Sequence, residues 1–368
     1  MRFFVVFVLL CALCGGAFAA DYRSETLSEE ITWFDASEKP VRLYGVLPPS
    51  PDEPYYHRMP PEAAERVSEG VADSRGTTSG GRVRFYTDSP FVAVHARLWR
   101  AGLREYMTRI IYAGFDMYVQ TGNEKPRYAG YTTVPQDFYG GHDSLIYTGS
   151  PGTVTLFMPL YGGVRELYVG VKKGSVIKEA PGYKYEKPVV FYGSSITHGA
   201  AASRNGNSYP AMLSRSLDAA FINLGFGGCA LGEQAMAEYI AGLEMSAFVL
   251  DYDHNAPTAG HLRDTHYAFY KTIRKKQPEL PIIMLSRPKP VLGPDEKERL
   301  EIIKSTYAKA RAEGDKNVYF IAGNTLVDDY AGDAWSVDRV HPNDNGFACM
   351  AKGIEKTLKP ILEKSGAR

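Results

Sequence analysis

The sequence predicts a two-domain protein, in which an antiparallel β-sandwich precedes a doubly wound, five-stranded α/β/α sandwich built on a parallel sheet. Three observations lead to this fold class. The chain has 368 residues, which is more than one ordinary hydrophobic core requires. Its first half contains short segments of alternating apolar and polar residues between turn sequences, a pattern typical of antiparallel strands. Its second half alternates continuous apolar runs with long helical patterns, which is typical of a parallel sheet.

The β-domain is predicted over residues 21–182. Alternation with period two marks the segments that we expect to be strands: 82–87, 91–98, 153–159 and 166–171. Turns rich in glycine, serine and proline, such as residues 149–152, separate these segments. The one helix expected in this half is a short one at residues 61–69. The spacing favours a β-sandwich or a jelly-roll-like domain, followed by a linker at residues 180–188.

The α/β domain is predicted over residues 187–368. Its apolar runs are expected to be strands: 189–192, 220–224, 247–251, 281–285 and 318–321. Helical patterns fall between or beside them: 209–217, 232–243, 262–276 and 295–313. A last helix should begin at a cap formed by Asn343 to Asn345, because apolar side chains recur at helical spacing from Phe347 to Leu358. Pro188 stands at the first position of the first strand, where its missing N–H costs least.

The first 20 residues have the pattern of a secretory signal peptide. Arg2 supplies a positive charge, residues 3–13 are almost wholly apolar, and Ala17-Phe18-Ala19 forms a cleavage site of small residues. The apolar run is too short to span a membrane as a helix. The alternative, a buried N-terminal strand, has less support. We therefore expect residues 1–20 to be removed and the mature protein to be secreted or periplasmic.

The charge balance and the cysteine count exclude two classes of protein. Lys+Arg and Asp+Glu both total 42, so the formal net charge is zero. Because binding to phosphates needs a basic excess or patch, no nucleic-acid partner is expected. Of the four cysteines, Cys229 and Cys349 lie beyond the predicted signal peptide. These two can pair in an oxidising compartment, but they are too few for a disulfide scaffold.

Ser195 is the candidate nucleophile. The turn Gly193-Ser194-Ser195 directly follows the first apolar strand of the α/β domain. In an open parallel sheet such a turn lies at the carboxyl edge, where ligands bind. A serine in this kind of turn is more often a cap or a plain turn residue. A nucleophilic role therefore requires a base, an orienting acid and hydrogen-bond donors for the oxyanion from later strand ends.

Asp338 and His341 can supply the acid and the base. The acid stands three residues before the histidine, in a loop just ahead of the last helix. Pro342 disfavours helical backbone at His341 and keeps that residue extended. An imidazole on such a loop can point over the sheet edge while the carboxylate bonds its far nitrogen. The alternative is that both are ordinary polar loop residues.

Donors for an oxyanion can come from the ends of the next two strands. Gly225, Gly227 and Gly228 follow the second strand, and glycine lets backbone N–H groups approach a ligand closely. Asn255 follows the third strand and carries a side-chain amide. The alternatives are a plain strand-to-helix turn for the glycines and a helix or turn cap for the asparagine.

The residues after the third strand also suggest a second hypothesis, a metal-binding site. Asp251, Asp253 and His254 stand together after the third strand, and His261 and His266 follow. These histidines lack the i, i+4 spacing of a helical metal-binding pair. We therefore expect no metal site, and no other cofactor is needed for serine chemistry.

Taken together, the motifs resemble those of the SGNH (GDSL-type) hydrolase superfamily. Gly-Ser-Ser-Ile-Thr at 193–197, Asn-x-Gly-x-x-Gly at 223–228, the run that ends at Asn255, and Asp-x-x-His at 338–341 are similar to its four blocks. The resemblance implies Ser195 as nucleophile, His341 as general base and Asp338 as orienting acid. It also implies an oxyanion hole made by the N–H groups of Ser195 and Gly228 and by Asn255 Nδ2.

The sequence departs from the family pattern at several positions. Ser194 stands where the family name has Asp, and Asp253 and Ala256 replace the outer residues of the usual Gly-x-Asn-Asp. The β-domain resembles one that precedes such hydrolases, because Gly-Phe-Asp-Met-Tyr at 114–118 is similar to its Gly-x-Asp-Leu-Tyr motif, with Met117 in place of Leu.

The combined expectation is a secreted serine esterase. The resemblance suggests short acyl groups, especially acetyl, on carbohydrate, so the substrate would be a small-molecule or polysaccharide ester. A lipid or lysophospholipid esterase is one alternative. A catalytically inactive glycan-binding module is another, although the Ser, His, Asp and Asn positions are complete. Loops near residues 114–118 and 135–142 of the β-domain are expected to shape the substrate site.

Overall fold

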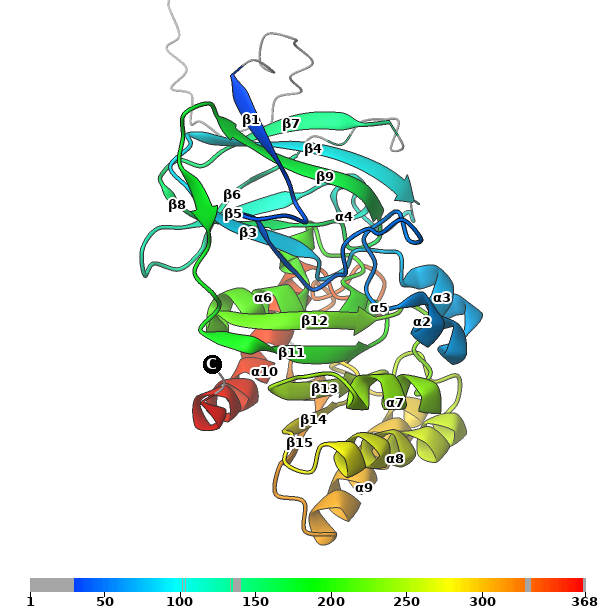
Figure 1. Cartoon of the computed structure of the whole chain (residues 1–368). Coiled ribbons are helices and arrows are strands. Elements are labelled where there is room, and N and C mark those ends of the chain that lie inside the picture. Colours follow the sequence, from blue (N-terminus) through cyan, green and yellow to red (C-terminus); the bar gives the residue numbers. More distant parts are fainter. Residues whose placement is uncertain are drawn as a thin grey trace, which may run out of the picture.

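The computed structural model describes residues 30–366 except 101, 103, 133, 135–139 and 328–331. The predicted signal peptide, residues 1–20, lies outside this part of the chain. Two antiparallel sheets form the N-terminal domain, and a five-stranded parallel sheet flanked by helices forms the C-terminal domain (Figure 1). The predicted fold class is confirmed.

The N-terminal domain stacks its two sheets on an apolar core that includes Val83, Phe85, Val94, Leu156 and Val169. One sheet has the order β1 (Ile31–Asp35), β9 (Gly163–Lys172), β4 (Phe91–Arg100) and β7 (His142–Tyr147). The other has the order β10 (Ile177–Glu179), β3 (Arg82–Thr87), β8 (Gly152–Phe157), β5 (Asp116–Gln120) and β6 (Arg127–Tyr131), with β2 (Arg42–Tyr44) paired to β3. Three short helices are found in the described part of this domain: α2 (Pro61–Val67) and α3 (Glu69–Ser74) lie between β2 and β3, and α4 (Arg109–Ala113) lies between β4 and β5.

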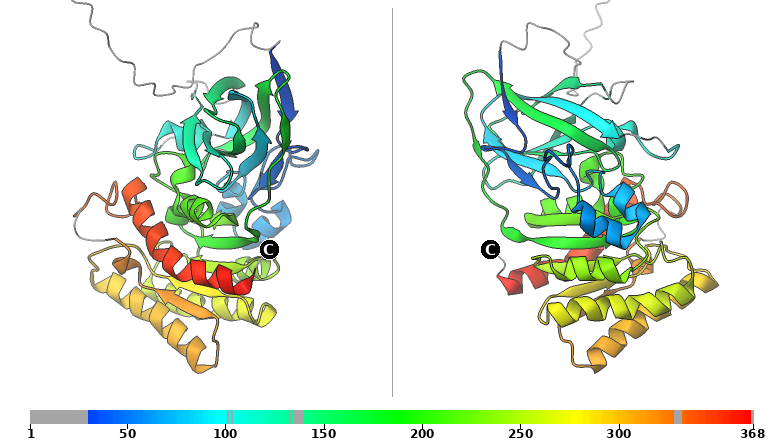
Figure 2. Two further views of the ribbon diagram at one scale, coloured as in Figure 1. Left: turned by 90° about the vertical axis from the view of Figure 1, so that its left-hand side faces the viewer. Right: turned by 45° about the vertical axis from the view of Figure 1, so that its right-hand side comes forward.

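The C-terminal domain is built on parallel strands in the order β12 (Ala219–Gly225), β11 (Tyr185–Gly193), β13 (Ala247–Asp251), β14 (Ile282–Leu285) and β15 (Val318–Ile321). Its helices are α5 (Ser195–His198), α6 (Tyr209–Leu217), α7 (Gln234–Ala241), α8 (Ala259–Lys276), α9 (Pro294–Ala312) and α10 (Asp344–Ser365). Helices α6 and α10 cover one face of the sheet, and α7, α8 and α9 cover the other (Figure 2). Both faces are therefore buried, which explains the continuous apolar runs.

The start of the first parallel strand differs from the expectation. β11 begins at Tyr185, so Pro188 lies inside the strand and the linker is shorter than predicted. The register between β11 and β12 shifts between Tyr185 and Val189. A proline has no N–H for the sheet ladder, so this irregularity is where it can be accommodated.

Two further observations bear on the sequence predictions. None of the helices in the described part of the chain is long and apolar enough to cross a membrane. No disulfide joins Cys229 and Cys349. The Cys229 thiol instead lies 3.6 Å from the carbonyl oxygen of Gly227.

Candidate active site

Ser195 lies at the carboxyl edge of the parallel sheet, as the first residue of α5. β11 ends at Gly193, where a side chain would collide with Thr197 and with the backbone of Asp251. Ser194 then caps α5 by accepting a hydrogen bond from the N–H of Ile196 (3.1 Å). This tight turn from strand to helix places the Ser195 side chain at the sheet edge.

His341 and Asp338 meet Ser195 in a continuous hydrogen-bonded relay. Ser195 Oγ lies 2.9 Å from His341 Nε2, and His341 Nδ1 lies 2.6 Å from Asp338 Oδ2. Asp338 Oδ1 also accepts hydrogen bonds from the backbone N–H groups of His341 (2.7 Å) and Val340 (3.0 Å). Burial alone would raise the pKa of Asp338, but these donors outweigh it and lower that pKa. The carboxylate is therefore ionised at neutral pH and can orient the imidazole.

The loop that carries this pair is fixed to the start of α10. Ser336 and Pro342 form an isolated β-bridge across it. The backbone N–H of Asn343 bonds to Trp335 O (3.0 Å), and Asn343 Oδ1 caps α10 by accepting from Asn345 and Gly346. Of the expected cap residues, Asn343 is the cap and Asn345 donates to it. This anchoring holds His341 over the end of β11.

The loop of residues 226–228 lies beside Ser195 and is called the oxyanion loop below, after the role that is proposed for it. Phe226 N–H bonds to Gly193 O (2.9 Å), and a side chain at Gly227 would approach Ser195 Cβ to 3.3 Å. Asn255 Nδ2 donates to Phe226 O (2.8 Å), while Asn255 Oδ1 accepts from Gly228 N–H (3.3 Å). The structure thus brings Ser195, Gly228 and Asn255 together. It also shows that Asn255 holds the loop, which its position in the sequence did not reveal.

The buried carboxyl group of Asp251 fixes α5 through hydrogen bonds. Asp251 Oδ2 accepts hydrogen bonds from Thr197 Oγ1 (2.9 Å) and from Tyr209 OH (3.0 Å). Burial raises the pKa of Asp251 to about 7 despite these two donors. The network joins β13, α5 and α6, and so fixes the helix that begins with Ser195.

Asp253, which follows β13, is held in buried ion pairs, and the neighbouring His254 ring is neutral. Asp253 is buried and pairs with Arg287 (3.0 Å) and Arg299 (3.6 Å). Burial opposes ionisation of Asp253, but Arg287 outweighs it and lowers the pKa of this carboxyl. Burial also lowers the pKa of His254 to about 3, so its ring is neutral. Over residues 30–366, apart from the gaps given above, no group of three or more His, Cys, Asp or Glu residues could hold a metal ion.

Two tyrosines of the N-terminal domain reach the relay. The Tyr106 ring stacks on the imidazole of His341, with ring centroids 4.8 Å apart and an interplanar angle of 19°. Tyr161 OH donates to Ser195 O (3.4 Å), and its ring stacks on His198 at 3.9 Å. Sequence reasoning missed both residues, because no local motif marks them.

A cavity of about 450 Å³ opens beside the relay and is lined by both domains. The C-terminal domain contributes Gly227 and His198. The N-terminal domain contributes a mostly polar wall that includes Asp73, Thr77, Arg100, Arg104, Tyr112 and Tyr161. Residues 114–118 were expected to shape the substrate site, but none of them lines this cavity. Asp116 is instead buried and accepts a hydrogen bond from Gly206 N–H of the C-terminal domain (3.0 Å). Residues 135–139 lie outside the described part of the chain.

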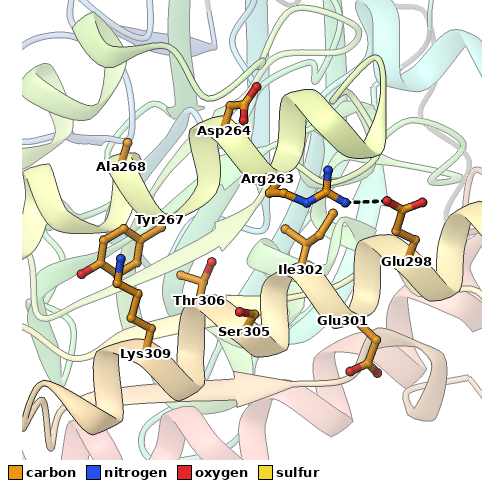
Figure 3. A pocket seen from close by; sticks show the side chains of 10 residues that line it. All are labelled: Arg263, Asp264, Tyr267, Ala268, Glu298, Glu301, Ile302, Ser305, Thr306 and Lys309. Atoms are coloured by element: carbon orange, nitrogen blue, oxygen red, sulfur yellow. Dashed lines mark hydrogen bonds and ion pairs between the residues drawn. The ribbon is translucent and has the colours of Figure 1, made fainter.

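A second hollow of about 490 Å³ lies between α8 and α9 (Figure 3). Its charged groups compensate one another: Arg263 pairs with Glu298 (2.5 Å), and Lys309 Nζ lies 3.6 Å from the centroid of the Tyr267 ring. None of the five predicted site residues lines this hollow or the cavity of about 450 Å³. The cavity of about 450 Å³ is the candidate substrate site because two of its lining residues, Tyr161 and Gly227, lie against Ser195.

The fold is that of an SGNH-type ester hydrolase. Residues 186–359 match the model of the GDSL-like lipase/acylhydrolase family, and residues 31–177 match the model of the GxDLY domain, the N-terminus of SGNH-hydrolase-type esterases. The protein is thus an ester-hydrolysing enzyme whose C-terminal domain belongs to the GDSL-like lipase/acylhydrolase family and whose N-terminal domain is of the GxDLY type. The resemblance predicted from the sequence motifs is confirmed.

Solved structures resemble the whole described chain. A protein described as a GDSL-like lipase from Bacteroides ovatus is 29% identical, with a TM-score of 0.78 over 90% of this chain and 98% of that one. A salicylyl-acyltransferase from a tetracycline biosynthetic pathway is 19% identical, with a TM-score of 0.74 over 90% and 97%. An acetyl xylan esterase from the rumen bacterium Butyrivibrio proteoclasticus is 14% identical, with a TM-score of 0.57 over 91% and 99%. No curated protein matches the chain.

Proposed function

We propose that the protein is a secreted serine esterase that removes short acyl groups, chiefly acetyl, from carbohydrate esters. The observation that carries the proposal is the relay from Ser195 through His341 to Asp338, with contacts of 2.9 and 2.6 Å. A hydroxyl, an imidazole and an ionised carboxylate in this order are the elements of nucleophilic acyl transfer.

In the proposed reaction, Ser195 Oγ attacks the ester carbonyl carbon and gives its proton to His341 Nε2. The carbonyl oxygen becomes an anion, and the imidazolium is stabilised by Asp338 through Nδ1–H. Collapse of this intermediate breaks the bond to the leaving alcohol, which takes the proton from His341. Water then attacks the acyl-serine with the same base, and the acid and free serine are released.

The oxyanion would be bound by the N–H groups of Ser195 and Gly228 and by Asn255 Nδ2. One Nδ2 hydrogen of Asn255 is used by Phe226 O, and the other has no acceptor among the described residues. Gly228 N–H makes only a long bond of 3.3 Å to Asn255 Oδ1. Both groups can therefore redirect a donor to a substrate oxygen at small cost.

The substrate class is supported by the wall of the cavity beside Ser195. Asp73, Arg100, Arg104 and Thr77 present polar groups there, which suit a hydroxyl-rich leaving group better than a long acyl chain. The acetyl xylan esterase with the same fold acts on an acetylated polysaccharide, as its name states. Secretion is supported by the signal-peptide pattern of residues 1–20.

The test is substrate selectivity of the mature chain, beginning at residue 21, against a Ser195→Ala control. We expect p-nitrophenyl acetate to be hydrolysed at least about tenfold faster, by kcat/KM, than the octanoate ester, and acetate to be released from acetylated xylan. Faster hydrolysis of octanoate or of lysophospholipid would favour the lipid esterase instead. Equal rates for the wild type and Ser195→Ala would favour the inactive glycan-binding module.

A further inference from the structure

The parallel sheet has an edge strand next to the active site. β12 pairs with β11 on one side and is the first strand in the sheet order. Since Phe226 N–H points to Gly193 of β11, the alternation of a strand directs the carbonyls of residues 221, 223 and 225 to the other side. These residues are buried, so the carbonyls on the free side need partners within the protein.

Two arginines of the N-terminal domain supply these partners. Arg82 of β3 donates from Nη1 to Phe221 O (3.1 Å). Arg58 donates from Nη1 to Asn223 O (3.3 Å) and to Gly225 O (2.5 Å). The side chains are almost wholly buried, with 0% and 3% exposed. Two guanidinium groups therefore bond the carbonyls that a further strand would otherwise bond.

Within the described part of the chain, no carboxylate acts on either arginine. The ionisable groups that act on Arg58 are Tyr161, Arg100 and Cys229. Burial lowers the pKa of Arg58 to about 9, so the group remains a cation at neutral pH. Its planar face lies 4.3 Å from the centroid of the Phe226 ring. Burial of a cation without an ion-pair partner costs folding free energy, so the position of Arg58 points to a role other than stability.

The two arginines differ in where they hold the strand. Arg82 binds near its beginning and also donates to Gly80 O (2.8 Å) and to Tyr183 OH (2.7 Å). Arg58 binds its last carbonyl, Gly225 O, directly before the oxyanion loop. Arg58 Nη2 is itself anchored to Ser74 O (2.8 Å) at the end of α3. The oxyanion loop is thus held from one side by Asn255 and from the other by Arg58.

We propose that Arg58 is a positioning residue for the oxyanion loop, fixing Gly225 O and the Phe226 ring so that Gly228 N–H faces the carbonyl above Ser195. This inference rests on the proposed function. Arg58 does not touch the substrate and acts through the backbone of residues 225–228. Its loss should therefore weaken stabilisation of the anionic intermediate more than binding of the neutral ester.

The experiment compares Arg58→Met with Arg82→Met, because the control removes a similar buried cation from the same edge of β12. For each protein we would measure kcat and KM with p-nitrophenyl acetate, the melting temperature, and inhibition by methylboronic acid. The boronate forms a tetrahedral anion on a nucleophilic serine and so reports the oxyanion site. We expect Arg58→Met to lose about 10- to 100-fold in kcat and a similar factor in boronate affinity, with KM changed less than about threefold.

Arg82→Met should lower the melting temperature but keep kcat and boronate affinity within about threefold of the wild type. Equal losses of kcat in the two variants, or an Arg58→Met variant with full kcat and boronate affinity, would overturn the inference. If either Met variant fails to fold, the same comparison is made with Arg58→Lys and Arg82→Lys, since lysine keeps the charge but cannot bridge these carbonyls as a guanidinium does. A wild type that neither hydrolyses the ester nor binds the boronate contradicts the proposed function, whatever the variants do.

Discussion

Replacement of Asn255 by Ala separates the two roles that the structure gives this residue. Asn255 makes two hydrogen bonds to the oxyanion loop, one of 2.8 Å to Phe226 O and one of 3.3 Å from Gly228 N–H. Each bond contributes about 0.5–1.5 kcal/mol, so their loss should cost roughly 1–3 kcal/mol of unfolding free energy. The loss of an oxyanion donor should further lower kcat by about 10²–10³, or roughly 3–4 kcal/mol in the barrier.

The assay is kcat with p-nitrophenyl acetate and the melting temperature on the same preparation, with kcat measured well below melting. Asn205→Ala is the matched control, because Asn205 Nδ2 donates to Gly114 O (2.8 Å) and Asn205 Oδ1 accepts from Leu160 N–H (3.2 Å), the same pair of bonds. We expect both variants to melt lower and Asn255→Ala alone to lose kcat. A melting temperature lowered in both, with kcat within a few-fold of the wild type in both, would show that Asn255 is only a structural support.

The remaining predictions concern the nucleophile, the orienting acid and the buried carboxyl group of Asp251. Ser195→Ala should abolish turnover and fluorophosphonate labelling with little change in melting temperature, whereas loss of labelling in Ser194→Ala alone would move the nucleophile by one residue. Asp338→Asn should still be labelled, but more slowly, because the imidazole loses the carboxylate that orients it; an unchanged labelling rate would contradict that role. Because the pKa of Asp251 is raised to about 7, the unfolded chain loses this proton at a lower pH than the folded protein, and the free energy of unfolding falls as the pH rises from about 4 to 7. The melting temperature of the wild type should therefore fall relative to that of Asp251→Asn between about pH 4 and 7, and parallel profiles would argue against the raised pKa.

The activity should also respond to pH through His341, which accepts the serine proton only when it is neutral. Because a general base must be deprotonated to accept a proton, we expect kcat/KM to fall as the pH is lowered from about 8 to 5. Burial keeps His254 neutral throughout this range, so it should add no second transition. A rate that is independent of pH in this range would contradict a histidine base.

The elements that local patterns mark were predictable from the sequence. α6 and β13 have the predicted bounds, because a proline near the start of the helix and four consecutive apolar residues in the strand leave little freedom. The contact between Ser195 and His341 is also foreseeable, since both follow strand or loop signals at one edge of the sheet. Prediction of the beginning of β11 failed, because Pro188 is tolerated only through a register shift that no local pattern reveals.

The contribution of the N-terminal domain to the site was not predictable in this way. Tyr106 and Arg58 precede Ser195 by long stretches of chain, and each is placed by the packing of one domain on the other. The ion pairs of Asp253 with Arg287 and Arg299 likewise join residues from different parts of the chain. Because the sequence does not show these ion pairs, it left Asp253, next to His254, as a candidate metal ligand.

The central claim is that Ser195 forms a covalent acyl intermediate. The most direct measurement is mass spectrometry of the enzyme quenched in acid within milliseconds of mixing with excess p-nitrophenyl acetate. The account predicts an added acetyl group on the peptide that contains Ser195, equal in amount to the burst of p-nitrophenol and absent in Ser195→Ala. A burst without acetylated Ser195, or an acetyl group on another residue that turns over at the catalytic rate, would contradict it.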